Sequence, residues 1–134
     1  HKAIKATEES QLESFDRLYY IIAFKFNLAL VINDQGKLDE SIELKKDIIP
    51  NLQSIINNSK DEDLVNKSKR LQASSISNLA AFYNDAGFLT KASKMLHYAY
   101  NIKKELYEPE DPKLITTLSQ IAISEYNLKE YDSN

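Results

Sequence analysis

Residues 78–89 of this chain read Asn-Leu-Ala-Ala-Phe-Tyr-Asn-Asp-Ala-Gly-Phe-Leu. Leu79 and Tyr83 stand one helical turn apart, and the small residue Ala80 lies between them on the same stretch. The run ends at Gly87, which suits the left-handed conformation that follows many helices. The stretch therefore predicts the end of one amphipathic helix and a tight turn into the next.

The same landmarks recur 51 residues earlier in the chain. The earlier copy contains Asn27-Leu28-Ala29, Gly36-Lys37-Leu38 and Ser41, which match Asn78-Leu79-Ala80, Gly87-Phe88-Leu89 and Ala92. A third copy begins 42 residues after the second as Gln120-Ile121-Ala122, with Tyr131 at the place of Leu38 and Leu89. Self-similarity at such periods is typical of stacked helical repeats.

Small residues mark the point where the two helices of each hairpin are expected to cross. Ala29 in the first copy and Ala80 in the second have Ser41 and Ala92 opposite them. Side chains of this size let two helix backbones approach closely. We expect all four to be buried at a helix crossing.

The leucines around each crossing have predicted roles in packing. Leu28 and Leu79 are expected to fill the volume beside the crossing, and Leu38 and Leu89 to close the turn end of each hairpin. The two copies are thus expected to have the same interior.

Apolar periodicity predicts five helices and the start of a sixth at Lys129. Pro50 is expected to kink or break the second helix, because proline lacks an N–H and crowds the preceding turn. Asp111 can cap the fifth helix, with Pro112 in its first turn. The five helices cover about residues 9–33, 38–56, 63–84, 89–106 and 112–127.

The predicted fold is all-α, with stacked antiparallel helical hairpins in one domain over residues 1–134. The hairpins cover about residues 9–57 and 62–106, and a partial third covers about 111–134. With only two glycines and three prolines, the composition favours long helices over a sandwich or a barrel.

Charge and hydropathy exclude two classes of partner. The net charge is −3, and both signs are mixed along the chain, so no basic surface for nucleic acid is expected. The most apolar run, residues 19–32, is too short to span a bilayer and contains Lys25 and Asn27. We expect no membrane insertion by this fragment.

The repeat resembles the tetratricopeptide repeat, in the long form of about 42 residues that kinesin light chains carry. The resemblance covers about residues 22–134 and is carried by Asn78–Tyr83, Gly87, Leu89, Ala92, Ala99 and the loop 107–112. It implies a right-handed superhelix and an intracellular adaptor or scaffold, either cytoplasmic or mitochondrial. Three departures stand out: the first interval is nine residues longer than 42, Ile48 replaces Ala99, and Lys129 replaces the turn glycine.

The resemblance also implies a concave groove along one face of the first helix of each hairpin. Residues at helical spacing on that face form three sets: Asn27, Leu30 and Asp34; Ser74, Asn78, Ala81 and Asp85; Thr116, Gln120, Ile123 and Asn127.

Two kinds of polar residue in this groove suggest a ligand. The amides of Asn27, Asn78 and Gln120 can bond the backbone of an extended peptide, or they are ordinary solvated residues. Asp34 and Asp85 oppose the dipole at helix C-termini, which points to a neutral or basic ligand. Alternatively, aspartate there simply suits the turn before glycine.

Nothing in the chain predicts catalysis, a cofactor or a metal. There is no cysteine, no paired histidine, no glycine-rich phosphate loop and no Ser–His–carboxylate set at helical spacing. His97 has no acidic residue or second histidine one turn away, so it is interpreted as a packing or surface residue.

The sequence therefore predicts a non-catalytic module that binds a peptide or helix of another protein in its groove. The alternative is a structural arm that stacks on itself or on further repeats without a separate ligand. Because the third hairpin is incomplete, exposed apolar surface is expected around Leu118 and Ile121. That surface would allow weak self-association.

Overall fold

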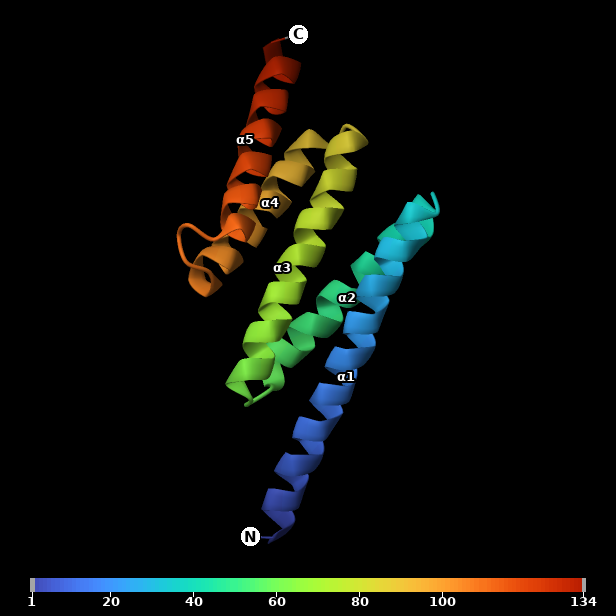
Figure 1. Ribbon diagram of the computed structural model, residues 1–134, viewed down its shortest axis with the longest axis vertical. Helices are drawn as coiled ribbons and strands as arrows, with labels where there is room; N and C mark the ends of the chain where they lie inside the picture. The colour runs from blue at the N-terminus through green and yellow to red at the C-terminus, as the bar shows by residue number, and fades with distance from the viewer. Residues whose placement is uncertain (1, 134) are drawn as a thin grey trace. The chain divides into compact units, whose positions relative to one another are not determined.

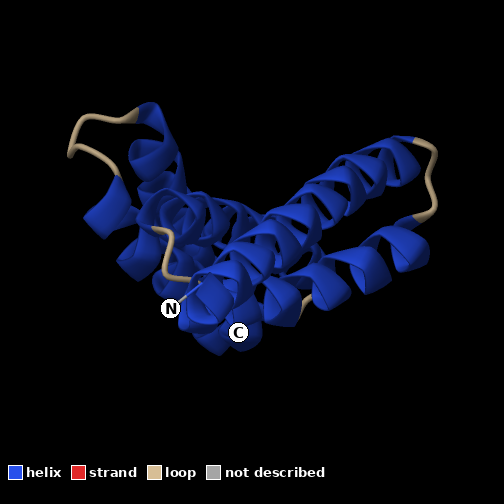
Figure 2. Ribbon diagram, turned by 90° about the horizontal axis from the view of Figure 1, so that it is seen from below, coloured by secondary structure: helices blue, strands red, loops and turns tan. Residues whose placement is uncertain are grey.

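The computed structural model describes the backbone of residues 2–133 and the side chains of residues 10 and 13–130. Over this range the chain forms helices and short connections, with no strand, which confirms the all-α prediction (Figures 1 and 2). The five helices are α1 (Lys2–Asp34), α2 (Leu38–Asn58), α3 (Glu62–Asp85), α4 (Leu89–Leu106) and α5 (Pro112–Ser133).

Contacts divide the chain into two compact units. The first unit comprises residues 1–72 and contains α1, α2 and the beginning of α3. The second comprises residues 73–134 and contains the rest of α3 with α4 and α5. The boundary falls inside α3 and not in the polar connection before it.

In the first unit, α1 and α2 cross at the predicted small residues. The Ser41 hydroxyl donates a hydrogen bond of 3.0 Å to the backbone carbonyl of Ala29. Both residues are fully buried. A bond between a side chain and the opposite backbone requires close approach of the two helices, so the predicted crossing is confirmed for this copy.

The core of the first unit lies between α1, α2 and the start of α3. Gln72 of α3 holds α2 through its side-chain amide, which donates to the Ile49 carbonyl at 3.2 Å and to the Gln53 side chain at 3.0 Å. The buried apolar cluster consists of Ile22, Ile48, Leu52, Ile55 and Leu64, with Phe15, Leu18, Tyr19, Phe26 and Leu71 packed against it.

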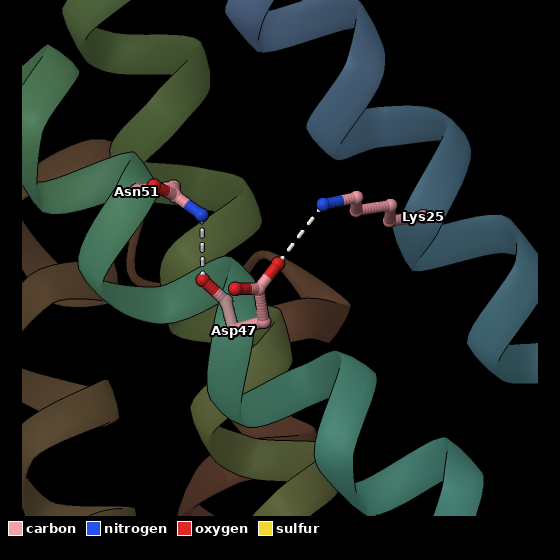
Figure 3. Close-up of polar contacts among 3 residues, drawn as sticks. All are labelled: Lys25, Asp47 and Asn51. Atoms are coloured by element: carbon pink, nitrogen blue, oxygen red, sulfur yellow. Dashed lines mark hydrogen bonds and ion pairs between the residues drawn. The ribbon is translucent and has the colours of Figure 1, made fainter.

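An ion pair spans the solvent side of the same helix pair. The Lys25 ammonium of α1 lies 3.0 Å from the Asp47 carboxylate of α2 (Figure 3). On α2 itself, the Asn51 side chain donates to the Asp47 backbone carbonyl at 2.9 Å. Exposed pairs of this kind contribute about 0.2–1 kcal/mol, so the apolar cluster dominates the stability of the unit.

The two predicted glycine turns have the same geometry. Gly36 has a φ of +80° and Gly87 a φ of +90°, both in the left-handed region. In the first turn the Lys37 N–H donates to the Ile32 carbonyl at 3.1 Å, and in the second the Phe88 N–H donates to Tyr83 at 2.8 Å. These bonds, each from a residue to the carbonyl five positions before it, are the Schellman closure of a helix C-terminus.

Where the third copy lacks this glycine, no turn forms. Helix α5 continues through Lys129 to Ser133, so the predicted sixth helix is wrong within the described residues. The physical reason is local: lysine strongly disfavours the left-handed conformation that ends the other two helices. The side chain of Tyr131, expected at a hairpin end, lies outside the described residues.

Helix α2 runs through Pro50 without a break, so of the kink or break expected there the break does not occur. Pro50 is exposed, whereas Ile48 and Leu52 on either side are fully buried. Burial of these neighbours offsets the hydrogen bond that proline cannot donate.

Two leucines expected to be interior are not. Leu28 is 37% exposed and Leu38 is 47% exposed, whereas Leu79, the equivalent of Leu28, is buried. In the first unit α1 packs against α2, and Leu28 is neither in the buried apolar cluster nor among the residues packed against it. The two copies therefore share their turns and crossing residues but not their whole interior.

Candidate functional site

The second unit has a small core where α3, α4 and α5 meet. Ala80, Leu96 and Ile121 supply one buried residue from each helix. Ala92 is also fully buried, as predicted for a residue at a crossing, and so is Ala99. This core holds the facing sides of α3 and α5 close to α4.

The start of α5 is capped as predicted. The Asp111 carboxylate accepts a hydrogen bond of 2.9 Å from the Lys113 backbone N–H. Side-chain acceptors at this position satisfy N–H groups that the helix itself leaves unpaired. The cap fixes the residue at which α5 begins.

One residue of the predicted self-association surface is placed differently. Ile121 is only 8% exposed, because it packs into the core with Ala80 and Leu96. Leu118 does remain exposed, together with Ile115 and Tyr126 on the same helix. Helix α5 therefore has an exposed apolar side, as expected, but Leu118 belongs to it and Ile121 does not.

The second unit has a pocket of about 100 Å³ that is lined by residues of α3, α4 and α5. Its interior is apolar, and its polar groups come from the C-terminal end of α3 and the middle of α5. It is lined by Ala80, Ala81, Asn84, Asp85, Leu96, Gln120 and Ile123. A volume of this size holds one aliphatic side chain.

Four of the predicted groove residues line this pocket together. Ala81 and Asp85 come from α3, and Gln120 and Ile123 come from α5. These four residues were predicted from the repeat pattern alone. The structure brings them together in one pocket, although they lie on two helices that are separate in the sequence.

The other predicted groove residues do not line the pocket. On α3, Ser74 and Asn78 precede it on the face that also carries Ala81 and Asp85, and both are half-buried. On α5, Thr116 is exposed and Asn127 is half-buried. The remaining three, Asn27, Leu30 and Asp34, are exposed on α1 in the other unit.

Sequence reasoning missed three lining residues: Ala80, Leu96 and Asn84. Asn84 is the most informative, because its side-chain oxygen is buried and has no hydrogen-bond partner among the described atoms. Its equivalent 51 residues earlier, Asn33, has the same unpaired oxygen. The repeated sequence Asn-Asp-x-Gly at both turns was a signal that could have identified it.

The polar groups around the pocket are available to a ligand. Neither the Gln120 amide nor the Asp85 carboxylate has a side-chain hydrogen bond or ion pair with any described residue. The buried Asn84 oxygen can only accept a hydrogen bond. An apolar group flanked by an N–H donor or a cation would complement this arrangement.

His97 lies outside the pocket and is half exposed, as its interpretation as a packing or surface residue allows. Its Nε2 atom is 3.1 Å from the Glu125 carboxylate, so the residue links α4 to α5. This acidic partner is 28 positions away and could not be inferred from helical spacing. Among the described residues, no group of three His, Cys, Asp or Glu side chains could hold a metal ion.

A buried lysine ties the three helices of this unit together. The Lys103 ammonium donates to the Thr117 hydroxyl at 2.9 Å and lies 3.5 Å from the Ser77 hydroxyl. Lys103 lies in the last turn of α4, and its side chain is buried. Burial, with a smaller effect of the Lys113 charge, holds the pKa of Lys103 below its ordinary value of 10.5.

Replacing Lys103 by methionine is expected to stabilise the protein by about 1–3 kcal/mol near pH 7, because a buried charge without a carboxylate partner is removed. As the pH rises, the Lys103 ammonium of the wild type loses its proton at a lower pH in the folded state than in the unfolded state. The wild-type free energy of unfolding should therefore rise as the pH passes the lowered pKa toward 10.5, and the variant should lack this gain. Urea unfolding of the wild type and of the variant, near pH 7 and near pH 10.5, measures the difference in the free energy of unfolding.

Lys104→Met is the matched control, because this neighbouring lysine is exposed. It should change neither the stability nor its dependence on pH. Equal behaviour of the two variants would contradict the buried position of Lys103.

No helix that the structure describes has both the length and the apolar character needed to cross a membrane. Comparison of the chain with known protein families, with curated proteins and with solved structures finds no match.

Proposed function

We propose that this chain is a non-catalytic protein-interaction module that holds a peptide or helix of a partner protein. The pocket of the second unit is the proposed point of capture. The observation that carries the proposal is the meeting of Ala81, Asp85, Gln120 and Ile123 around one apolar hollow. The unpaired oxygen of Asn84 in the same place adds a polar group that a ligand would satisfy.

The chemistry of capture follows from the lining residues. One aliphatic side chain of the ligand would fill the hollow between Ala80, Leu96 and Ile123, and its full burial contributes about 1.5–3 kcal/mol. Gln120 can both donate to and accept from a peptide backbone, and each such bond contributes about 0.5–1.5 kcal/mol. The carboxylate of Asp85 favours a ligand that is basic, or at least not acidic.

We further propose that the chain is a divergent tetratricopeptide-like repeat that serves as an adaptor or scaffold inside the cell. Support comes from the two equivalent glycine turns and from the burial of Ala29, Ala80, Ala92 and Ala99. A module of this kind needs no cofactor, since its work is to hold a bound protein.

Selection of a displayed random peptide library on the immobilised chain tests the proposal. Two kinds of peptide should be enriched: those with an aliphatic residue next to a lysine or an arginine, and those with an aliphatic residue next to a turn of the peptide backbone. The affinity of an enriched peptide should fall about tenfold for Gln120→Ala, the loss of roughly one net hydrogen bond to the ligand. Asp85→Asn should weaken basic peptides selectively.

Asn101→Ala is the control, because Asn101 is an exposed amide on α4 that does not line the pocket. It should leave the affinity unchanged. Enriched peptides that bind Gln120→Ala, Asp85→Asn and the wild type equally would show that the pocket is not the site of capture.

A further inference from the structure

A stripe of large apolar side chains is exposed along α1. Tyr20 and Phe24 are each 68% exposed. They lie on the side of the helix opposite Ile22 and Ala29, which face the core of the first unit. An apolar stripe on one helix face of a folded protein marks an interaction surface. The stripe consists of Tyr20, Ile21, Phe24, Leu28 and Val31.

The stripe has the seven-residue spacing of a coiled-coil seam. Arg17, Phe24 and Val31 are seven residues apart and take the a positions. Tyr20, Asn27 and Asp34 then take the d positions three residues after each. A seam of this spacing fits another helix that has the same spacing. Between its ends the seam carries Tyr20, Phe24 and Val31 with one amide, Asn27, and its two ends carry opposite charges.

We propose that two copies of this chain associate through α1, with the two helices antiparallel. In an antiparallel pair, each a position lies beside a d position of the second copy. The register that places Tyr20 beside Val31 of the second copy also places Phe24 beside Asn27. The same register places Arg17 beside Asp34. Each of these contacts occurs twice, because the two copies are related by a two-fold axis.

The charges at the ends of the seam select this orientation. Arg17 and Asp34 are both exposed, and neither has an ion-pair partner among the described side chains. An antiparallel pair brings the opposite charges together at both ends. A parallel pair would place Arg17 against Arg17 and Asp34 against Asp34, which is unfavourable at both ends. A second copy in the antiparallel orientation is therefore the occupant that the charges fit.

The area of the stripe is consistent with a weak dimer. The five side chains are 37–68% exposed, which is roughly 100 Å² each, so the stripe offers about 500 Å² on one copy and about 1,000 Å² in the pair. That is close to the lower bound of ~1,000 Å² for specific interfaces, so a dissociation constant of about 1–100 µM is expected. The pairing covers Asn27 and Asp34.

Sedimentation velocity of the whole chain over about 1–500 µM tests the association, since this range brackets the expected dissociation constant. The wild type should change from monomer to dimer. Phe24→Glu should weaken the dimer at least about tenfold, because it places two carboxylates in the centre of the seam. Circular dichroism should remain that of the wild type, since Phe24 is exposed.

Ile115→Glu is the matched control, because Ile115 is a similarly exposed apolar residue on α5. It should leave the dimer intact. A wild type that stays monomeric throughout, or a dimer lost with Ile115→Glu and kept with Phe24→Glu, would overturn the proposal.

Exchange of the end charges tests the orientation. Arg17→Asp and Asp34→Arg should each weaken the dimer, because each places like charges together in the antiparallel pair. An equimolar mixture of the two variants should associate again as a mixed dimer, because the aspartate introduced in one variant then meets the arginine introduced in the other. Failure of the mixture to associate while the wild type dimerises would exclude this register.

Covalent trapping gives a second readout, because the chain has no cysteine of its own. Under oxidation, Tyr20→Cys mixed with Val31→Cys should give a disulfide-linked dimer of the two variants. Tyr20→Cys alone should give little, since the two copies of residue 20 lie far apart in an antiparallel pair. Efficient linkage of Tyr20→Cys to itself would instead indicate a parallel pair and contradict the proposal.

Discussion

Replacing Leu52 by alanine is expected to lower the free energy of unfolding by about 2–5 kcal/mol. Leu52 is fully buried on α2, in the cluster where that helix meets α1 and α3. Its truncation removes apolar contacts and leaves a cavity that packed helices fill only partly. Because domains of this size are stable by only about 5–15 kcal/mol, the loss is a large fraction of the total. Urea unfolding followed by circular dichroism measures it.

The matched control is Leu38→Ala on the same helix. Leu38 was expected to close the hairpin end, but it is nearly half exposed. Its truncation should therefore cost less than about 1 kcal/mol, since little apolar area returns to water. A large loss at Leu38 with a small one at Leu52 would show that the interior of the first unit lies elsewhere.

Replacing Ala80 by leucine is expected to destabilise the protein by about 1–3 kcal/mol through overpacking. Ala80 is fully buried in the cluster with Leu96 and Ile121, where α3, α4 and α5 meet. The three additional carbon atoms must either force α3, α4 and α5 apart or enter the pocket that Ala80 also lines. The melting temperature should fall if the helices are forced apart, and a variant that melts like the wild type would show that the pocket accepts the larger side chain.

Ala81→Leu separates this packing effect from an effect on binding. Ala81 is adjacent to Ala80 but exposed, so its stability change should stay within about 0.5 kcal/mol. Because Ala81 lines the pocket, the larger side chain should occupy part of the hollow. A folded Ala81→Leu variant that no longer captures the selected peptides would support the proposed site.

Much of the candidate site could be predicted because the repeat places equivalent residues on equivalent helix faces. Ala81 and Asp85 followed from their spacing along α3, and Gln120 and Ile123 from theirs along α5. What could not be predicted was that these two helix faces would line one pocket together with Leu96 of α4. That depends on how three helices pack, which spacing along a single helix does not specify.

The order of the five helices, the glycine-terminated ends of α1 and α3, the capped start of α5 and the small residues at the crossings could be predicted from the amino-acid pattern. The end of α5 could not. The features that could be predicted depend on a few adjacent residues, such as Gly87 after Asp85, whose conformational preferences act locally. Burial was a different matter. Lys103 is buried although its neighbour Lys104 is exposed, and Leu28 is exposed although its equivalent Leu79 is not. Which side chain meets water depends on the other helices that cover it, and only the packed structure supplies that information.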